Sequence, residues 1–298
     1  MAHFLDLKEF SEEMILGVIQ QAALMKAAQN EGLPTDLLPE KVLTMIFEKP
    51  STRTRLSFEI GMKQLGGHAV YVKGDEVGLG ARESVEDVAR VVSRYSDYIM
   101  LRTFSHETLL RFAAAATVPV INGLTDKAHP CQAMTDLMTI LENKPLSDDL
   151  KVVFVGDGNN VCESLIEIMD KVGVQVTVAC PKGYEPVLHL DKAKIEHDVM
   201  TAVTNADVIY TDVWVSMGQD DEREARLNAF KPYQVTMDVL KQAKDDVIFM
   251  HCLPAERDFE VTNDVMESAH SVVFDQAENR MHAQKAILTL LGGELYEQ

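Results

Sequence analysis

The chain has 298 residues, 46% of them hydrophobic and 25% charged, and its 47 acidic and 28 basic side chains give a formal net charge of −19. This balance is typical of a globular protein of about two domains and excludes a disordered, collagen-like or coiled-coil chain. So negative a chain is also a poor general partner for nucleic acid or an acidic membrane, because long-range repulsion opposes approach.

Short β-branched runs alternate with longer amphipathic stretches along the whole chain, which is typical of a parallel α/β fold. In the first half the pattern predicts helices and strands at residues 43–47 (strand), 52–65 (helix), 69–72 (strand), 84–95 (helix), 98–101 (strand), 106–116 (helix) and 118–121 (strand). A helix at 130–142 and a polar segment at 143–149 then predict a domain boundary. The second half is predicted to contain strands at 151–155, 175–179, 208–211, 247–250 and 271–274, and helices at 160–172, 235–244 and 276–291.

No apolar run approaches the ~20 residues that a membrane helix needs, and the first residues contain no signal or transit peptide pattern. The four cysteines, Cys131, Cys162, Cys180 and Cys252, form no CxxC pair and match no zinc spacing. Scattered cysteines of this kind indicate reduced thiols, mostly in the core. We therefore expect a cytoplasmic protein without a membrane partner.

The strongest candidate site follows the first predicted strand, in the segment FEKPSTRTR. Pro50 ends the strand and Ser51 is suited to cap the helix that follows. A helix N-terminus offers free N–H groups and the positive end of the helix dipole, which suits a phosphate. Alone this could be a capped helix with surface arginines. In a chain of charge −19, three hydroxyls and two guanidiniums within five residues predict a phosphate site.

Two later segments add candidate ligands to this site, because open α/β sheets bind ligands at the carboxyl ends of their strands. Arg102 follows the strand predicted at 98–101 and could face either the crevice or solvent. His129 and Gln132 lie three residues apart at the start of the helix predicted from Pro130, so both can face one ligand. An imidazole and an amide suit a carbonyl group, although a single histidine is usually structural.

The second half carries a different set of polar groups at its predicted strand ends. GDGNN, residues 156–160, resembles half of a dinucleotide fingerprint, but Val161 stands where the third glycine would be required. We interpret it as a polar turn that offers side-chain amides. Asp212 could bind an ammonium group, Ser216 begins a loop, and Cys252 follows a strand directly. One cationic set and one set with an acid, amides and a thiol indicate a transferase with two substrates.

The segments FEKPSTRTRLSFE, HPCQ and HCLPA, with RTFSH, INGLTD, GDGNN and FDQAENRMHAQKA, resemble the aspartate/ornithine carbamoyltransferase family along nearly the whole chain. DVWVSMG and HCLPA resemble its ornithine-specific members. The resemblance implies transfer of the carbamoyl group from carbamoyl phosphate to the δ-amine of L-ornithine, giving L-citrulline and phosphate, with no metal or organic cofactor. It also implies a homotrimer or a multiple of three.

The fold implied is α/β, with two domains that are each a parallel sheet flanked by helices and an active site in the cleft between them. A carbamoyl phosphate domain would comprise residues 1–142 and the C-terminal helix 276–298, and an ornithine domain would comprise residues 143–275. The implied carbamoyl phosphate ligands are Ser51, Thr52, Arg53, Thr54, Arg102, His129, Gln132 and Arg280. The implied ornithine ligands are Asn160, Asp212, Ser216, Met217, Cys252 and Leu253.

The implied mechanism is direct attack by a neutral amine on the carbamoyl carbon. Arg53, Thr54, Arg102 and His129 would stabilise the developing oxyanion; Cys252 and Arg280 complete the expected catalytic group, and Asp212 is expected at the α-amino end of ornithine. Many relatives carry QLGRGES in a loop that reaches a neighbouring subunit, whereas this chain has Gly78 and Arg82 in GLGARES. The open alternatives are a carbamoyltransferase for another amine, such as putrescine, and a non-catalytic homologue that binds a phosphate ligand.

Overall fold

The computed structural model describes residues 3–216, 218–294 and 296. The chain forms two compact units: Met1–Met138 with Glu278–Gln298, and Thr139–Ala277. The chain passes from one unit to the other twice, within helix α6 (Pro130–Asn143) and within helix α12 (Val273–Gly292). Each unit contains its own parallel sheet, so the predicted α/β class is confirmed.

The first unit is built on a four-stranded parallel sheet in the order β2-β1-β3-β4. Its strands are β1 (Val42–Phe47), β2 (His68–Lys73), β3 (Tyr98–Arg102) and β4 (Val120–Leu124). Its helices are α1 (Glu12–Asn30), α2 (Thr52–Gln64), α3 (Gly74–Val77), α4 (Val85–Val92), α5 (His106–Ala115), the first part of α6, and most of α12 (Val273–Gly292).

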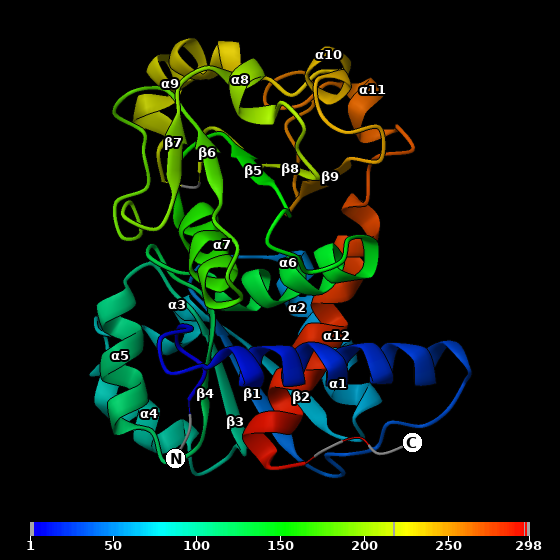
Figure 1. Cartoon of the computed structure of the whole chain (residues 1–298). Coiled ribbons are helices and arrows are strands. Elements are labelled where there is room, and N and C mark those ends of the chain that lie inside the picture. Colours follow the sequence, from blue (N-terminus) through cyan, green and yellow to red (C-terminus); the bar gives the residue numbers. More distant parts are fainter. Residues whose placement is uncertain (1–2, 217, 295, 297–298) are drawn as a thin grey trace. The chain divides into compact units, whose positions relative to one another are not determined.

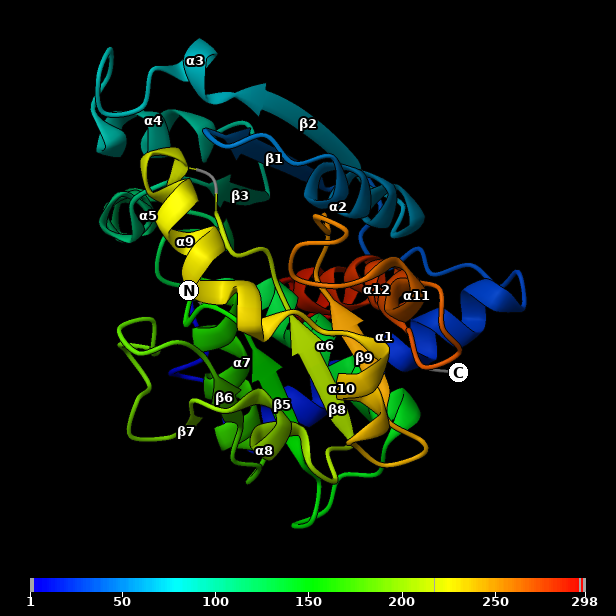
Figure 2. The ribbon, with the colours of Figure 1, turned by 90° about the horizontal axis from the view of Figure 1, so that it is seen from above.

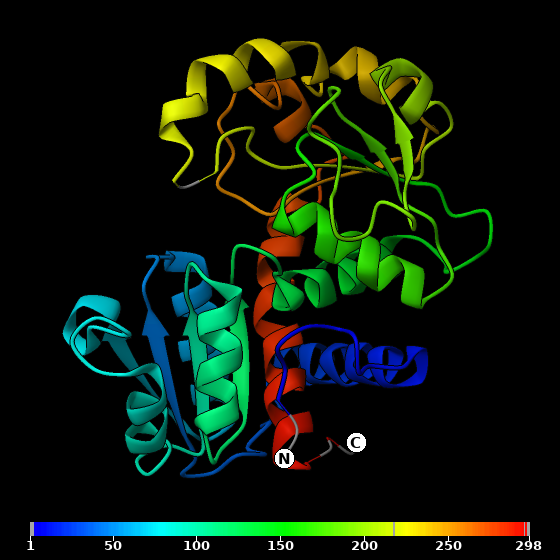
Figure 3. The same cartoon turned by 90° about the vertical axis from the view of Figure 1, so that its left-hand side faces the viewer.

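Apolar side chains on one face of this sheet pack against α4 and α5 in a continuous core. Ile99 and Leu101 of β3 meet Val88 of α4 and Phe112 of α5 there, and Figure 3 shows α5 running alongside the strands. Elsewhere in this unit α2 and α12 approach closely, since a β-carbon added at Gly61 would lie 3.2 Å from Cγ of Lys285. The close contact fixes the position of α12 beside the helix that begins with the STRTR motif.

The second unit has a five-stranded parallel sheet in the order β7-β6-β5-β8-β9, in which β5, β8 and β9 point the same way (Figure 2). Its strands are β5 (Val152–Val155), β6 (Thr177–Ala179), β7 (Lys194–Glu196), β8 (Val208–Thr211) and β9 (Ile248–His251). Its helices are α7 (Asn160–Lys171), α8 (Val199–Val203), α9 (Arg223–Phe230), α10 (Met237–Lys241) and α11 (Asn263–Met266), with 3₁₀ turns at Asp220–Glu222 and Lys231–Tyr233. Figure 1 labels these elements.

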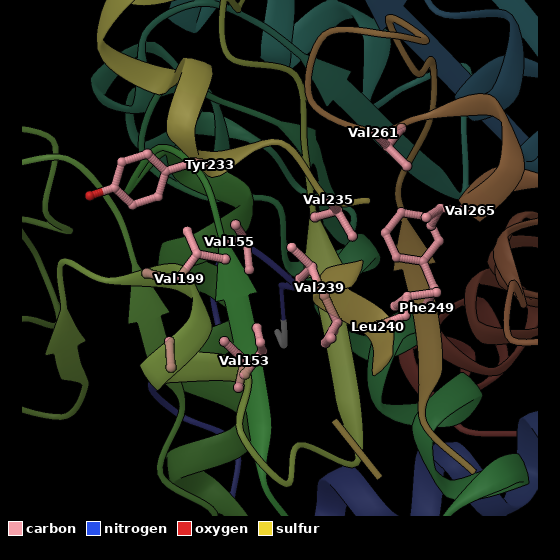
Figure 4. Packing of buried hydrophobic residues seen from close by; sticks show 14 of the residues in the cluster. Val153, Val155, Val199, Tyr233, Val235, Val239, Leu240, Phe249, Val261 and Val265 are labelled. Carbon is pink, nitrogen blue, oxygen red and sulfur yellow. The ribbon is translucent and has the colours of Figure 1, made fainter. Parts of the chain in front are cut away.

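The core of the second unit lies between the sheet and the short helices α8, α10 and α11. Figure 4 shows Val153 of β5 and Phe249 of β9 near Val199, Leu240 and Val265, which come from those three helices. Strands β5, β8 and β9 are buried at every position, which means on both faces of the sheet, and this explains why they are mainly apolar and do not alternate with polar residues.

Two of the predicted elements are wrong, and one long helix was not predicted. Residues 271–274 do not form a strand: Ser271 makes only an isolated bridge with Phe249, and α12 begins at Val273. The helix predicted at 235–244 is limited to α10, because Val235 forms a bridge with Val261. Helix α1 was missed. Within the described residues, no helix combines the length and the apolar character that a membrane crossing requires.

Candidate functional site

The STRTR segment starts helix α2 directly after strand β1. Ser51 is the N-cap residue in extended backbone, and its hydroxyl accepts a hydrogen bond from the Thr54 N–H at 3.3 Å. The capping oxygen satisfies one of the N–H groups that the first turn of a helix leaves without a partner. The cap therefore holds the hydroxyls of this turn at the positive end of the helix dipole.

The hydroxyl of Thr54 is where three separate segments of the first unit meet. Arg280 of α12 donates to Thr54 Oγ1 at 2.8 Å, Arg102 at the end of β3 lies 3.5 Å from the same oxygen, and the Ser51 hydroxyl lies 3.1 Å from it. Both guanidiniums are buried, at 4% and 5% exposure. Burial in a low-dielectric interior strengthens their action on any nearby anion.

His129 and Gln132 belong to the same buried group. Gln132 Oε1 accepts from Arg280, and its amide donates to Asp136 at 2.8 Å, which orients the side chain. Burial, and then the positive charges of Arg280 and Arg102, hold the pKa of His129 well below its ordinary value of 6.5. The imidazole is therefore neutral at physiological pH and offers a hydrogen bond rather than a charge.

Arg53 and Arg55 differ sharply although they are only two residues apart. Arg55 forms an ion pair with Glu59 at 3.1 Å and lies over the ring of Tyr71, so its environment is explained without a ligand. Arg53 is half-buried and makes no hydrogen bond or ion pair within residues 3–216, 218–294 and 296. Its guanidinium is accordingly available to an anion. Thr52, the first residue of α2, is exposed.

The segment GLGARES forms a tight turn between α3 and α4. Gly78 ends α3 in the left-handed conformation, with φ of 63°, and its carbonyl accepts hydrogen bonds from three successive N–H groups, those of Ala81, Arg82 and Glu83. A β-carbon at Gly78 would lie 2.7 Å from Cβ of Arg82. The glycine that departs from the common family pattern is therefore required by this backbone, and the Arg82 side chain is exposed.

In the second unit, Asp212 connects the GDGNN turn to the HCLP segment. It follows β8, is buried, and accepts from the Asn159 amide at 2.8 Å and from the Cys252 thiol at 3.0 Å. Asn159 also caps α7 by accepting from two N–H groups, those of Val161 and Cys162. Asn159 is not among the residues predicted from the sequence, although its place directly before a helix marks it as a capping residue. Asn160 is half-buried at the first position of α7.

Cys252 and Leu253 follow β9, as predicted for a strand end. Leu253 has a φ of 58°, and its N–H donates to His251 Nδ1 at 2.9 Å. The Cys252 thiol donates to Asp212 at 3.0 Å, so these two expected ornithine ligands are direct neighbours.

Ligand atoms of Asp212, His251 and Cys252 lie within 4.8 Å of one another, a grouping that could in principle bind a metal ion. Both ring nitrogens of His251 already have partners, since Nε2 lies 3.0 Å from Glu260 and Nδ1 accepts from Leu253. Two ligands remain, fewer than the three or four that a protein zinc site uses. The donor set therefore does not fit a resident metal.

A buried ion pair supports the segment that leads into the loop at Ser216. Arg226 of α9 pairs with Asp157 at 2.9 Å and donates to the Trp214 carbonyl at 3.3 Å. Ser216 is half-buried and its N–H donates to Gln219. The predicted ligand Met217 lies outside the described residues.

The other three cysteines are buried, and burial raises the pKa of both Cys131 and Cys180 to about 12 and that of Cys162 well above its ordinary value. Only Cys252, among the four, is partly exposed. It is thus the cysteine thiol, among the four, that a substrate could reach.

Comparisons with known proteins find relatives along nearly the whole chain. The family model "Aspartate/ornithine carbamoyltransferase, carbamoyl-P binding domain" matches residues 2–142, and the model "Aspartate/ornithine carbamoyltransferase, Asp/Orn binding domain" matches residues 148–291. An anabolic ornithine carbamoyltransferase of Pyrococcus furiosus is 50% identical over 96% of this chain and 95% of its own. One of Pseudomonas aeruginosa, also named anabolic, is 48% identical over 97% and 96%. A solved structure titled as the Pyrococcus furiosus ornithine carbamoyltransferase has a TM-score of 0.94 and 50% identity, covering 99% of this chain and 98% of that chain.

Proposed function

We propose, from the premise that this chain belongs to the aspartate/ornithine carbamoyltransferase family, that it is an ornithine carbamoyltransferase. It transfers the carbamoyl group of carbamoyl phosphate to the δ-amine of L-ornithine and releases L-citrulline and phosphate. The observation that supports this most is the meeting of Ser51, Arg102 and Arg280 at the Thr54 hydroxyl, because it joins three distant motif segments in one anion-binding group.

In the proposed site the first unit binds carbamoyl phosphate. The helix α2 N-terminus, Ser51, Thr52 and Arg53 bind the phosphate, which a helix N-terminus favours through its N–H groups and dipole. Arg53 also donates to the carbamoyl oxygen as negative charge develops on it, together with Thr54, Arg102 and the neutral His129. Gln132 and Arg280 complete the carbamoyl phosphate ligands.

The second unit binds ornithine in this proposal, through Asn160, Asp212, Ser216, Met217, Cys252 and Leu253. The neutral δ-amine attacks the carbamoyl carbon, the C–O bond to phosphate breaks, and the amine loses a proton as citrulline forms. Correct orientation of two bound substrates supplies much of the rate, since well-oriented intramolecular reactions gain ~7–11 kcal/mol. No metal or organic cofactor has a part in this scheme.

The proposal is tested by following the carbamoylated product, and the phosphate released with it, from carbamoyl phosphate with ornithine, putrescine and aspartate as separate acceptors. We expect turnover with ornithine alone. Turnover with putrescine would instead make the protein a carbamoyltransferase for another amine. Binding of carbamoyl phosphate without turnover on any acceptor would make it a non-catalytic homologue.

We further propose that the protein works in the cytoplasm as a homotrimer or a multiple of three. Four free cysteines fit a reducing compartment, and the assembly follows from the family resemblance. Because Gly78 removes a side chain from the loop that reaches a neighbouring subunit in relatives, Arg82 is the residue here that could supply charge to such a contact.

A further inference from the structure

His251 ends strand β9, and its imidazole lies between Leu253, two residues later in the chain, and the buried Glu260. Figure 2 shows β9 beside β8 in the sheet of the second unit. The Leu253 N–H donates to His251 Nδ1 at 2.9 Å, and His251 Nε2 lies 3.0 Å from the Glu260 carboxylate. Since Nδ1 accepts a hydrogen bond, it carries no proton, and the proton of the neutral ring must be on Nε2, donated to Glu260.

Glu260 is held so that it can fix this tautomer. The side chain is fully buried, and its Oε1 also accepts from the Glu256 N–H at 2.6 Å. The backbone N–H of His251 donates to Gln276 Oε1 at 2.9 Å, which holds the other end of the residue. An imidazole fixed at both ring nitrogens and at its own backbone presents Nδ1 in one orientation.

The hydrogen bond to His251 Nδ1 comes from a residue with an unusual backbone conformation. Leu253 has a φ of 58°, a left-handed conformation that a residue with a branched side chain adopts rarely and keeps only when its surroundings determine it. The hydrogen bond from its N–H to Nδ1 is one such determinant. The same turn sets where the Cys252 thiol and the Leu253 carbonyl lie.

We propose that His251 and Glu260 form a positioning pair for the amine-binding turn. Glu260 holds the tautomer of His251, His251 holds the Leu253 N–H, and the turn thereby places the Cys252 thiol against Asp212 and presents the Leu253 carbonyl. Neither His251 nor Glu260 needs to touch a substrate. The proposal rests on the proposed function only in that Cys252 and Leu253 are taken as the groups nearest the reacting amine.

The experiment compares two substitutions that each keep one half of the imidazole's hydrogen bonding. The amide of H251N occupies the place of Nδ1 and can still accept from Leu253, whereas that of H251Q occupies the place of Nε2 and reaches Glu260 instead. H197Q is the matched control: His197 is a partly exposed histidine of the same unit whose Nδ1 lies 2.8 Å from the Cys180 carbonyl. Each variant is measured for kcat/KM with ornithine, for equilibrium binding of carbamoyl phosphate, and for its melting temperature.

We expect H251Q to lower kcat/KM for ornithine ~10²-fold, since a small misplacement of a reacting group costs about this factor. H251N should lose less than ~10-fold, H197Q should match the unaltered protein, and carbamoyl phosphate binding should change less than about twofold in all three. Equal losses in H251Q and H251N, or a parallel loss of carbamoyl phosphate binding, would overturn the proposal. Should H251Q fail to fold, E260L provides the test: unchanged ornithine kinetics in that variant would equally overturn it.

Alkylation of Cys252 by iodoacetamide gives a readout that does not depend on turnover, because the other three thiols are buried. The pair predicts an altered rate in H251Q and a nearly unaltered rate in H251N, both compared with H197Q. If the protein without substitutions forms no citrulline, the proposed function is refuted. The alkylation rates of the variants still test the positioning pair in that case. Equal rates in all the variants overturn the pair even if citrulline is formed.

Discussion

Replacing Arg53 by alanine should separate binding chemistry from folding more cleanly than any other change in the STRTR turn. Its guanidinium has no hydrogen bond or ion pair to any residue that the structure describes, so the folded state loses no polar contact. Surface substitutions of this kind usually change the unfolding free energy by less than about 0.5 kcal/mol. Turnover should nevertheless fall ~10²–10³-fold, the typical loss when one donor to a developing oxyanion is removed, or about 2.7–4 kcal/mol.

Arg55→Ala is the matched control, because it removes the same side chain two positions away on the same helix. Arg55 does have partners, an ion pair with Glu59 and the ring of Tyr71. Exposed pairs at this helical spacing contribute about 0.3–0.5 kcal/mol, and an exposed cation–π contact about 0.5–1 kcal/mol. Arg55→Ala should therefore lower stability slightly more than Arg53→Ala while keeping most of the activity.

The assay is initial-rate citrulline formation with carbamoyl phosphate varied at saturating ornithine, run beside denaturant unfolding of each variant. Near-normal turnover in Arg53→Ala would remove Arg53 from the proposed site. Loss of turnover in both variants, with equal destabilisation, would show that either substitution disturbs the fold of the turn. The contacts of Arg53 and Arg55 would then not predict which of them binds substrate.

Three further outcomes follow from the same structure. Asp212→Asn should raise the ornithine concentration needed for half-maximal rate at least ~10-fold and leave carbamoyl phosphate affinity nearly intact in equilibrium titration; a collapse of carbamoyl phosphate affinity would contradict the separate assignment of the two substrates. Burial lowers the pKa of Lys285 from 10.5 to about 8. As pH falls from 10.5 to 8 the unfolded chain takes up this proton before the folded protein does, so the folded protein loses stability. Below pH 8 this lysine causes no further loss. Relative to Lys285→Met, denaturant unfolding should show a gain of about 3 kcal/mol as pH rises through this window, and an unchanged difference would refute the shifted pKa. Light scattering should report a trimer or a multiple of three, and a fully active monomer would reject the assembly.

Much of the polar cluster at the start of α2 could be predicted because its signals are local in the sequence. Pro50, Ser51 and the hydroxyls after them lie in one strand–turn–helix, where capping chemistry and helix direction follow from nearest neighbours. The same holds for Cys252, whose place after a β-branched run puts it at a strand end. A parallel sheet then gathers such ends at one edge.

The partners of Thr54 could not be derived from local pattern, because they depend on how distant segments pack. Arg280 lies on α12, a helix with buried polar residues on many sides, so no apolar stripe indicates which face meets α2. The run at 271–274 predicted a strand because it contains two β-branched residues. Here the first residue bridges to β9 once and the chain then turns into the helix. The contact of Asn159 with Asp212 could not be derived from the sequence, because it depends on strands β5 and β8 lying side by side.

The last prediction concerns the protonation state of the ornithine that binds. An alkyl amine with a pKa near 10.4 is neutral in only about one molecule per thousand near pH 7, and only the neutral form is nucleophilic. Asp212 beside Cys252 would favour the ammonium form, but both of its oxygens already accept hydrogen bonds, from Asn159 and from Cys252. An ammonium group would have to displace one of these donors, whereas a neutral amine need not.

We therefore expect the apparent affinity for ornithine to rise about tenfold per unit between pH 6 and 9, in step with the neutral fraction. Citrulline is the control ligand, since it has the same α-amino and α-carboxyl groups and no titrating δ-amine; its affinity should change far less over the range. Direct titration calorimetry measures both. A flat ornithine affinity would mean that the ammonium form binds and loses its proton inside the site, with Asp212, the nearest carboxylate to the Cys252 thiol, as the first group to examine as its acceptor.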